Sequence, residues 1–358
     1  LLLPINMQPA PLDGLNLASL PGRPATPPAA VADDAALDAA VDLARSHSRI
    51  VIKAGGGCRG ATAEVRALAE ALPAVVALSP GALGVLPDAH PLNMLVGGSK
   101  GSICGNHAMA GAGLAIVIGS RAVCQADCSG IGFTAAQAVI NINADLADAT
   151  HYNRTVALPG DAAAVIRKLL ARLAARGGAD PRRAEAWLAE TADRKREWIA
   201  YKAARYARPV LHDPVWGGEV LTQPAAIKIA ADFARSVGAV KFFDAGDVQA
   251  NGFQVVEDDR PLETVTDTGA SYMGFAPSAL VSAALAEQPR YGIAICGDGS
   301  FMMNPQVLVD AVEHGLRATV LILDNRRMAA ISALQDAQYG NEYRTRAAVQ
   351  VDYVALAS

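Results

Sequence analysis

The chain has 358 residues, and its 35 Asp and Glu side chains slightly outnumber its 31 Lys and Arg side chains, giving a formal net charge of −4. This length suits two or three domains, since a domain commonly holds about 100–200 residues, and the mild acidity without a Lys/Arg run argues against a nucleic-acid-binding protein. Hydrophobic residues make up 52% of the chain, yet no apolar run reaches the roughly 18 residues of a membrane span, and the five scattered cysteines are typical of a reduced, cytoplasmic protein.

The two ends of the chain both indicate a piece of a longer protein. The apolar run at 1–5 resembles the end of a buried strand, and the stretch 8–34 is so rich in Pro, Ala and Gly that it predicts a linker. At the other end, residues 353–358 have a helical pattern without the glycine that commonly follows a helix. We therefore expect a fragment of a longer protein.

From residue 49 the pattern changes to short apolar runs that alternate with helical stretches. We predict a helix over 61–72 and buried strands at 49–54, 74–78, 114–118 and 138–142. Strands that alternate with helices imply right-handed crossovers and a parallel sheet with helices on its faces. This first α/β domain is expected to cover residues 35–175.

The first strand is followed by six residues that fit a phosphate-binding pattern. Gly55-Gly56-Gly57-Cys58-Arg59-Gly60 matches G-x-G-x-x-G between a strand and a helix, which is the context of a dinucleotide fingerprint. That fingerprint also requires Asp or Glu after the next strand, and this strand instead runs into Ser79-Pro80. A tight strand-to-helix turn is therefore the favoured interpretation, with a nucleotide site as the alternative.

Residues 176–215 are charged and predict a helical connector, with Asp180-Pro181 as a helix start. A second α/β unit follows over 216–358, and its apolar patterns predict helices and strands in alternation. The predicted helices cover 224–237 and a stretch from about 304, and the predicted strands are 239–243, 291–296 and 318–323. The chain is thus expected to form two α/β domains, each with a parallel sheet between layers of helices.

Two polar residues follow the last two predicted strands. Asp298, in Gly297-Asp298-Gly299-Ser300, ends one strand, and Asn325 ends the next strand 27 positions later. In a parallel sheet both lie at the same edge, where α/β sheets bind ligands. One carboxylate, one amide oxygen and a loop carbonyl would leave Mg²⁺ free to bind two phosphate oxygens and a water. Gly299 allows a phosphate to approach the backbone, and Ser300 offers a hydroxyl. The alternative to a metal and phosphate site is that Gly297-Asp298-Gly299 and Asn325 only form ordinary turns.

With these residues the sequence resembles a known family. Gly297-Asp298-Gly299 followed at this interval by Asn325, with Phe301-Met302-Met303-Asn304 next to it, resembles the cofactor motif of thiamine-diphosphate enzymes such as the acetolactate synthases. The resemblance covers nearly the whole chain and implies a fragment of a three-domain enzyme that uses thiamine diphosphate and Mg²⁺. It assigns residues 1–34 to the end of a pyrimidine-binding domain and a linker, 35–175 to the central domain, 176–215 to the connector, and 216–358 to a C-terminally incomplete diphosphate-binding domain.

The resemblance also implies roles for individual residues. Asp298, Asn325 and the backbone carbonyl of Arg327 would ligate the metal. Met273 would hold the thiamine bent so that its amino group reaches the thiazolium C2, and the carbonyl of Ser271 would accept a bond from that amino group. A plain core role is the alternative for Met273. The other implied cofactor-binding positions follow the strands: Gly246, Asp247, Val248, Gly297, Gly299, Ser300 and Asn325.

Some positions depart from the family's pattern. Asp324 stands where an Asn is usual, and Arg326-Arg327-Met328 replaces a more common Gln-Gly-Tyr type of sequence, which leaves the expected ligand Asn325 in place. The resemblance places the loop 244–249 at the diphosphate. The alternative interpretation is a solvent-exposed turn that happens to carry two acidic residues. Residues 329–335 and 341–344 resemble the trihydroxycyclohexanedione hydrolase of inositol breakdown.

Three functions compete. The intact protein is expected to be a lyase or transferase on 2-oxo acids; the alternatives are a C–C hydrolase of a cyclic 1,2-dione and a non-catalytic cofactor-binding homologue. The family's catalytic Glu belongs to the pyrimidine-binding domain, so no catalytic residue is assigned and the fragment alone is expected to be inactive. The family also implies a homo-oligomer, a dimer or a tetramer, with no nucleic-acid or membrane partner.

Overall fold

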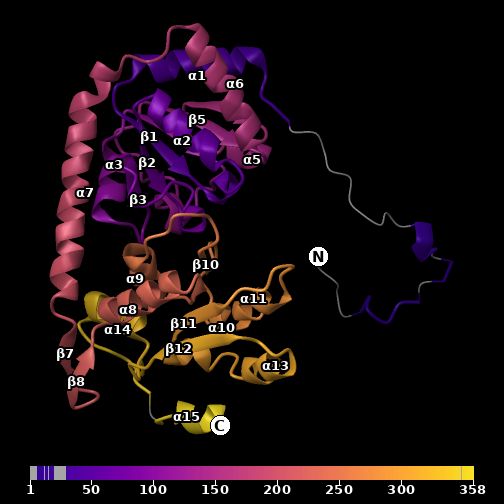
Figure 1. Cartoon of the computed structure of the whole chain (residues 1–358), viewed down its shortest axis with the longest axis vertical. Helices are drawn as coiled ribbons and strands as arrows, with labels where there is room; N and C mark the ends of the chain where they lie inside the picture. Colours follow the sequence, from indigo (N-terminus) through magenta and orange to yellow (C-terminus); the bar gives the residue numbers. More distant parts are fainter. Residues whose placement is uncertain (1–5, 12, 15, 20–29, 348) are drawn as a thin grey trace.

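The computed structural model describes residues 6–11, 13, 14, 16–19, 30–347 and 349–358. The strand end expected at 1–5 lies outside these residues. Within the described part, two parallel sheets lie one below the other, and a long helix runs beside both (Figure 1). None of the described helices is both long and apolar enough to cross a membrane.

The first sheet has six parallel strands in the order β3-β2-β1-β4-β5-β6. The chain order reverses between β1 and β4, which makes the gap between these strands a topological switch point. The strands predicted at 49–54, 74–78, 114–118 and 138–142 are confirmed, while β3 and β6 were not predicted. The strand bounds are β1 Ile50–Ala54, β2 Val75–Leu78, β3 Asn93–Val96, β4 Leu114–Ile118, β5 Ala138–Asn143 and β6 Thr155–Pro159.

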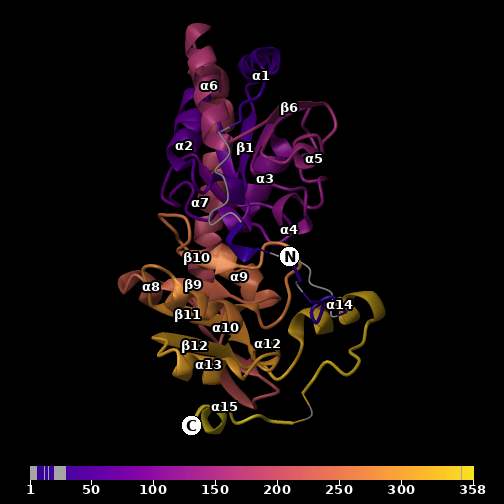
Figure 2. The same cartoon turned by 90° about the vertical axis from the view of Figure 1, so that its right-hand side faces the viewer.

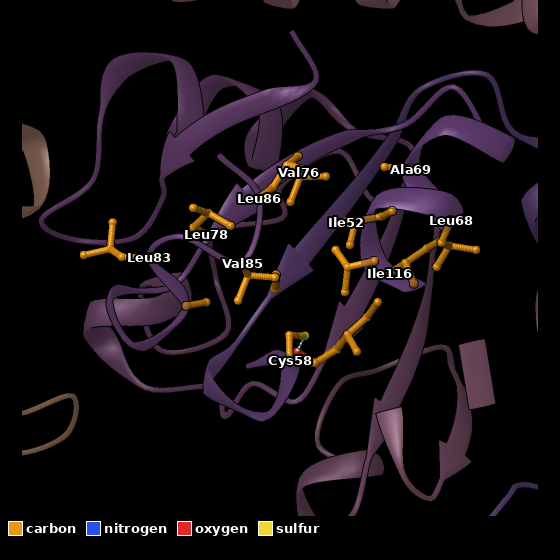
Figure 3. Packing of buried hydrophobic residues seen from close by; sticks show 14 of the residues in the cluster. Ile52, Cys58, Leu68, Ala69, Val76, Leu78, Leu83, Val85, Leu86 and Ile116 are labelled. Carbon is orange, nitrogen blue, oxygen red and sulfur yellow. Dashed lines mark hydrogen bonds between the residues drawn. The ribbon is translucent and has the colours of Figure 1, made fainter. Parts of the chain in front are cut away.

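Helices cover both faces of this sheet. Alternate strand residues such as Ile52 and Ile116 pack with Leu68 of α2 on one face (Figure 3), where α1 and α6 also lie. The intervening residues, Val51 and Val117 among them, pack against α3 and α7 on the other face. This alternation is what a strand buried on both sides requires. The helix bounds are α1 Asp34–Ser46, α2 Thr62–Ala71, α3 Ile103–Gly111, α6 Ala162–Ala175 and α7 Glu185–Tyr206.

The second sheet has four parallel strands in the order β10-β9-β11-β12. Its strands are β9 Val240–Phe243, β10 Thr264–Thr266, β11 Gly292–Gly297 and β12 Ala318–Leu323. Helices α8 (Gln223–Ser236) and α9 (Asp247–Val255) pack on one face, and α10 (Phe275–Leu280) and α11 (Ser282–Leu285) on the other. The predicted fold class, two α/β units built on parallel three-layer sandwiches, is confirmed.

Two predicted elements differ from the structure. The end of the expected helical connector is a strand, β7 (Val210–Asp213), which pairs antiparallel with β8 (Gly218–Leu221), because the Asp213 carboxylate accepts the N–H groups of Val215 and Trp216 and turns the chain. The helix expected from about residue 304 begins at Val307 as α13 (Val307–Glu313), and a separate short helix, α12 (Asp298–Phe301), precedes it. The shorter elements are η1 Leu17–Ser19, η2 Gly56–Cys58, η3 Pro80–Ala82, α4 Cys124–Asp127, α5 Leu146–Ala149, η4 Pro181–Ala184, α14 Ala329–Tyr339 and α15 Tyr353–Ala357.

Candidate functional site

Every strand of the second sheet is followed directly by an aspartate. Strands β9, β10, β11 and β12 end at Phe243, Thr266, Gly297 and Leu323, and the next residues are Asp244, Asp267, Asp298 and Asp324. Because the strands are parallel, these four residues lie at one edge of the sheet. That edge contains the predicted site.

The ends of β11 and β12 bring two carboxylates together. Gly297 pairs with Leu323 in the strand register, so Asp298 and Asp324 leave the sheet side by side. Burial raises the pKa of Asp298, and the neighbouring Asp324 carboxyl adds to the rise. Neither carboxylate has an ion-pair partner within the described part of the chain. The result is a half-buried pair of acids without a counter-charge.

The loop after β12 is held by the β7–β8 hairpin. The indole Nε1 of Trp216 donates a hydrogen bond to the carbonyl of Asp324 at 3.1 Å, and the Arg326 guanidinium lies 3.5 Å from the centroid of the Trp216 ring. Arg327 donates to the Asp213 carboxylate at 2.8 Å. On the same loop, Asn325 Oδ1 accepts the N–H of Arg327 at 3.1 Å. Two arginines that depart from the family pattern therefore fasten the loop that carries Asn325.

Asp244 ties the end of β9 to the segment around Met273. Its side chain is fully buried and accepts backbone N–H groups from Gly274 at 3.0 Å and from Ala276 at 2.8 Å. Gly274 directly follows Met273 and Ala276 lies three positions after it, so the carboxylate fixes the position from which the Met273 side chain leaves the backbone. Sequence reasoning placed Asp244 only in a loop and missed this role.

The Met273 side chain reaches the Gly297-Asp298-Gly299 turn. A Cβ atom on Gly299 would lie 3.2 Å from Met273 Cε, so the glycine leaves room for this side chain. The contact places Met273 between the carboxylate pair and the β9 end of the sheet. Met273 is half-buried rather than enclosed in the core, which agrees with its position at the site edge.

The turn between β9 and α9 supplies the third part of the site. Gly246 adopts a φ of +80°, and the space where its Cβ would stand is open. Asp247 is exposed, but the side chain of Val248 is buried in the core, so that only the backbone of Val248 can meet a ligand. A side chain at position 246 would therefore strain the backbone of the turn and would also occupy the open space beside it.

A lysine of the central domain joins this site. Lys100 Nζ donates to Gln249 Oε1 at 2.7 Å and to Ser271 Oγ at 3.2 Å. The fully buried Gln249 also accepts from the Ser271 hydroxyl and donates to Thr266 Oγ1 at 2.7 Å. This network holds Ser271 in an unusual left-handed conformation with φ of +59°. No sequence pattern pointed to Lys100, which lies about 150 positions before Gln249.

Residues 244–358 match the family model "Thiamine pyrophosphate enzyme, C-terminal TPP binding domain", and residues 37–169 match "Thiamine pyrophosphate enzyme, central domain". The chain belongs to the thiamine pyrophosphate enzyme family. The C-terminal match begins at Asp244 and includes Met273, Asp298 and Asn325.

Several acetolactate synthases are similar to this thiamine pyrophosphate enzyme chain. The large subunit of isozyme 1 from Escherichia coli K12 is 28% identical over 311 residues, which are 87% of this chain and 52% of that protein. The Corynebacterium glutamicum large subunit is 28% identical over 353 residues, 94% of this chain and 53% of that protein. A probable large subunit from Methanocaldococcus jannaschii is 27% identical over 330 residues, 89% of this chain and 53% of that protein. The chain therefore spans about half the length of these relatives.

The family's cofactor is thiamine diphosphate, with Mg²⁺ as the usual partner ion. The residues at the sheet edge fit such an ion, because Asp298 and Asp324 form a half-buried acidic pair that a divalent cation would offset. No group of three or more His, Cys, Asp or Glu side chains in the described residues is arranged to hold a metal by itself. A cation here would therefore also need amide, carbonyl and phosphate oxygens, which suits Mg²⁺.

The glycine-rich turn of the central domain lies at the switch point of the first sheet. A Cβ on Gly55 would stand 2.2 Å from the carbonyl oxygen of Gly119, and one on Gly57 would stand 2.8 Å from the Cα of Gly119. These glycines thus permit two backbone loops to touch, as a tight turn requires. The same loops border a cavity of about 310 Å³ that also includes Arg59 and Arg121.

Proposed function

We propose that the full-length protein is a thiamine-diphosphate- and Mg²⁺-dependent enzyme that forms or cleaves a C–C bond next to a carbonyl, with 2-oxo acids as substrates. The observation that carries this proposal is the meeting of Met273 with the Gly297-Asp298-Gly299 turn, in a segment fixed by Asp244. The residues proposed to bind the diphosphate, to bind the metal and to support the cofactor all lie at one edge of the second sheet. The chain is also similar to acetolactate synthases.

The proposal gives each predicted residue a task. Asp298, Asn325 and the carbonyl of Arg327 would hold Mg²⁺. The backbones of Gly246, Asp247 and Val248, together with Gly297, Gly299 and Ser300, would surround the diphosphate. The Ser271 carbonyl would hold the amino group of the pyrimidine ring, while Met273 would support the bent cofactor. Bound thiamine diphosphate supplies the nucleophile and the electron sink for the C–C chemistry, and this chain's residues bind it, orient it and exclude water.

Calorimetry on the full-length protein tests the binding half of the proposal. Asp298→Ala removes the charged metal ligand, so the affinity for thiamine diphosphate in the presence of Mg²⁺ should fall at least tenfold, or about 1.4 kcal/mol. The exposed Asp232, which pairs with Lys228 on α8, offers a matched control, since Asp232→Ala should leave the affinity unchanged. Equal affinity of wild type and Asp298→Ala would show that the metal assignment is wrong.

A second candidate function is hydrolysis of a C–C bond in a cyclic 1,2-dione. The segment that resembles such a hydrolase folds back on itself, since Gln335 Oε1 accepts the N–H of Tyr343 at 2.7 Å and Ser332 donates to Thr345 at 2.7 Å. It borders a cavity of about 290 Å³ beside Asn325 and Arg327. Assays of the full-length protein with pyruvate and with a cyclic dione distinguish the two reactions, and inactivity with both while cofactor still binds would support a non-catalytic homologue.

A further inference from the structure

Another cavity lies away from the proposed cofactor site, where the two domains meet α7. It measures about 460 Å³, within the roughly 300–1,000 Å³ typical of small-molecule sites. Its walls are α7, α8, the loop that carries Asp88 and the loop that follows α9. Any ligand bound there would touch both domains and the helix that connects them.

Most charges around this cavity already have partners. Lys195 donates to two backbone carbonyls at 2.9 Å each. Lys228 donates to Asp232 at 2.6 Å, and Arg235 forms an ion pair with Asp259. Lys195, Lys228 and Arg235 are therefore already compensated and do not need a bound anion.

Lys202 is different. Its side chain lines the cavity and is only 9% exposed, yet it has no hydrogen bond or ion pair to any described residue. One turn further along α7, the hydroxyl of Tyr206 is buried without a hydrogen-bond partner. Residues four apart lie on one helix face, so the ammonium and the hydroxyl belong to the same wall. The buried Tyr206 hydroxyl without a partner is costly, and the Lys202 ammonium has no counter-ion, so an anion that reaches both groups would stabilise this wall.

The Asp88 carboxyl interacts electrostatically with Lys202 but does not compensate its charge fully at neutral pH. Burial raises the pKa of Asp88 to about 8, with Asp258 adding to the rise. Asp258 itself forms a buried ion pair with Lys241 at 2.8 Å.

The walls indicate which anion would fit. Leu95, Ile199 and Ala203 give the cavity an apolar side, which suits a hydrocarbon chain. A doubly charged phosphate would meet one unpaired cation and the nearby carboxylates of Glu257 and Asp259, so a single negative charge is favoured. We propose that this cavity binds a small monocarboxylate with a short apolar chain, its carboxylate contacting Lys202 and Tyr206. This site is independent of the proposed cofactor chemistry.

Calorimetry with hexanoate as the probe tests the proposal on the full chain. Hexanoate should bind saturably, and hexanamide, which has the same shape without the charge, should bind at least tenfold more weakly. Lys202→Met keeps the length of the side chain without its charge and should also weaken hexanoate binding at least tenfold, while Lys202→Arg should retain most of it. Lys168→Met on the exposed side of α6 is the matched control and should change nothing.

Three results would overturn the inference. They are the absence of saturable hexanoate binding, equal binding by wild type and Lys202→Met, and displacement of hexanoate by inorganic phosphate at lower concentration. If Lys202→Met does not fold, as its melting curve would reveal, Lys202→Gln and Tyr206→Phe make the same comparison. Tyr206→Phe removes only the hydroxyl and should weaken hexanoate binding severalfold.

Discussion

At the scale of single residues, the strand-end aspartates divide their tasks. Asp298 and Asp324 form an acidic pair open to a cation, whereas the buried Asp244 is satisfied by backbone amides. The sequence pointed to Asp298 because its Gly-Asp-Gly setting is local. It could not show the role of Asp244, since the amides that this carboxylate binds belong to residues 30 and 32 positions later.

Met273 provides a prediction at this scale. Met273→Ala should lower turnover of the full-length enzyme by more than its loss of stability explains, because the cofactor would lose its support beside Gly299. Comparison of kcat with the melting temperature measures both effects. The exposed Met302 nearby offers Met302→Ala as the control. If Met273→Ala has normal turnover and unchanged cofactor affinity, Met273 only fills space in the core and does not support the cofactor.

Asp88 provides a second prediction, on pH. Its pKa is about 8 in the folded chain and about 3.9 in an unfolded one, so between these values the folded state binds one more proton. Stability from this group is therefore fully present at low pH and is lost as pH rises toward 8, by up to about 1.4 kcal/mol per pH unit. The charged groups around it are Asp258, Glu257, Lys195 and Lys202.

Urea unfolding of wild type and Asp88→Asn at pH 5, 6 and 7 measures this effect. The asparagine cannot ionise, so the stability of wild type relative to the variant should fall as the pH rises. Contributions from all other groups cancel in the difference as long as their pKa values are alike in the two proteins. Parallel pH profiles would contradict the raised pKa of Asp88.

At the scale of elements, long apolar strands could be predicted and short or edge elements could not. The strand 318–323 was predicted with the bounds that β12 has, because a short apolar run with the β-branched residues Thr319, Val320 and Ile322 is typical of a strand. The missed β10 has three residues, and β6 is partly exposed and ends in Pro159. The β7–β8 hairpin was missed since its residues are mostly exposed and lack an apolar pattern.

That hairpin gives the prediction at the element scale. Asp213→Asn would weaken the contact to Arg327 and loosen the loop that carries Asn325. The affinity for thiamine diphosphate with Mg²⁺ should then fall severalfold, which calorimetry measures. The effect should depend on Mg²⁺ concentration and shrink when the ion is in excess. An affinity equal to that of wild type would show that the hairpin does not support the metal loop.

At the scale of the whole molecule, the apolar surface around the site is uncovered. Tyr272 and Met303 are 56% and 59% exposed, and Leu334 and Tyr339 on α14 are 66% and 68% exposed. Figure 2 shows α14 standing to one side of the sheet. Where such side chains form one patch, they commonly mark an interface. The expectation of a pyrimidine-binding domain rests on family resemblance alone, because nothing in the local pattern describes residues outside this sequence.

We predict that the full-length protein is a dimer or a tetramer in which the pyrimidine-binding domain of one subunit covers this surface of another. Light scattering should report at least a dimer, and added thiamine diphosphate with Mg²⁺ should raise the melting temperature by mass action. The 358-residue chain alone should bind the cofactor weakly and turn over nothing. An active full-length monomer would contradict the interface, and an active 358-residue chain would contradict the need for the missing domain.

The bond from Lys100 to Gln249 and Ser271 has a consequence for chimaeric proteins. The junction between the two domains passes through the polar contacts that shape the loop of Ser271, so the domains are not interchangeable modules joined by a tether. A central domain grafted from a relative would have to bring a cation of matching reach at position 100, or the buried Gln249 Oε1 would keep only the Ser271 hydroxyl as a donor. In such a chimaera, Lys100 and Gln249 would have to be transplanted as a pair.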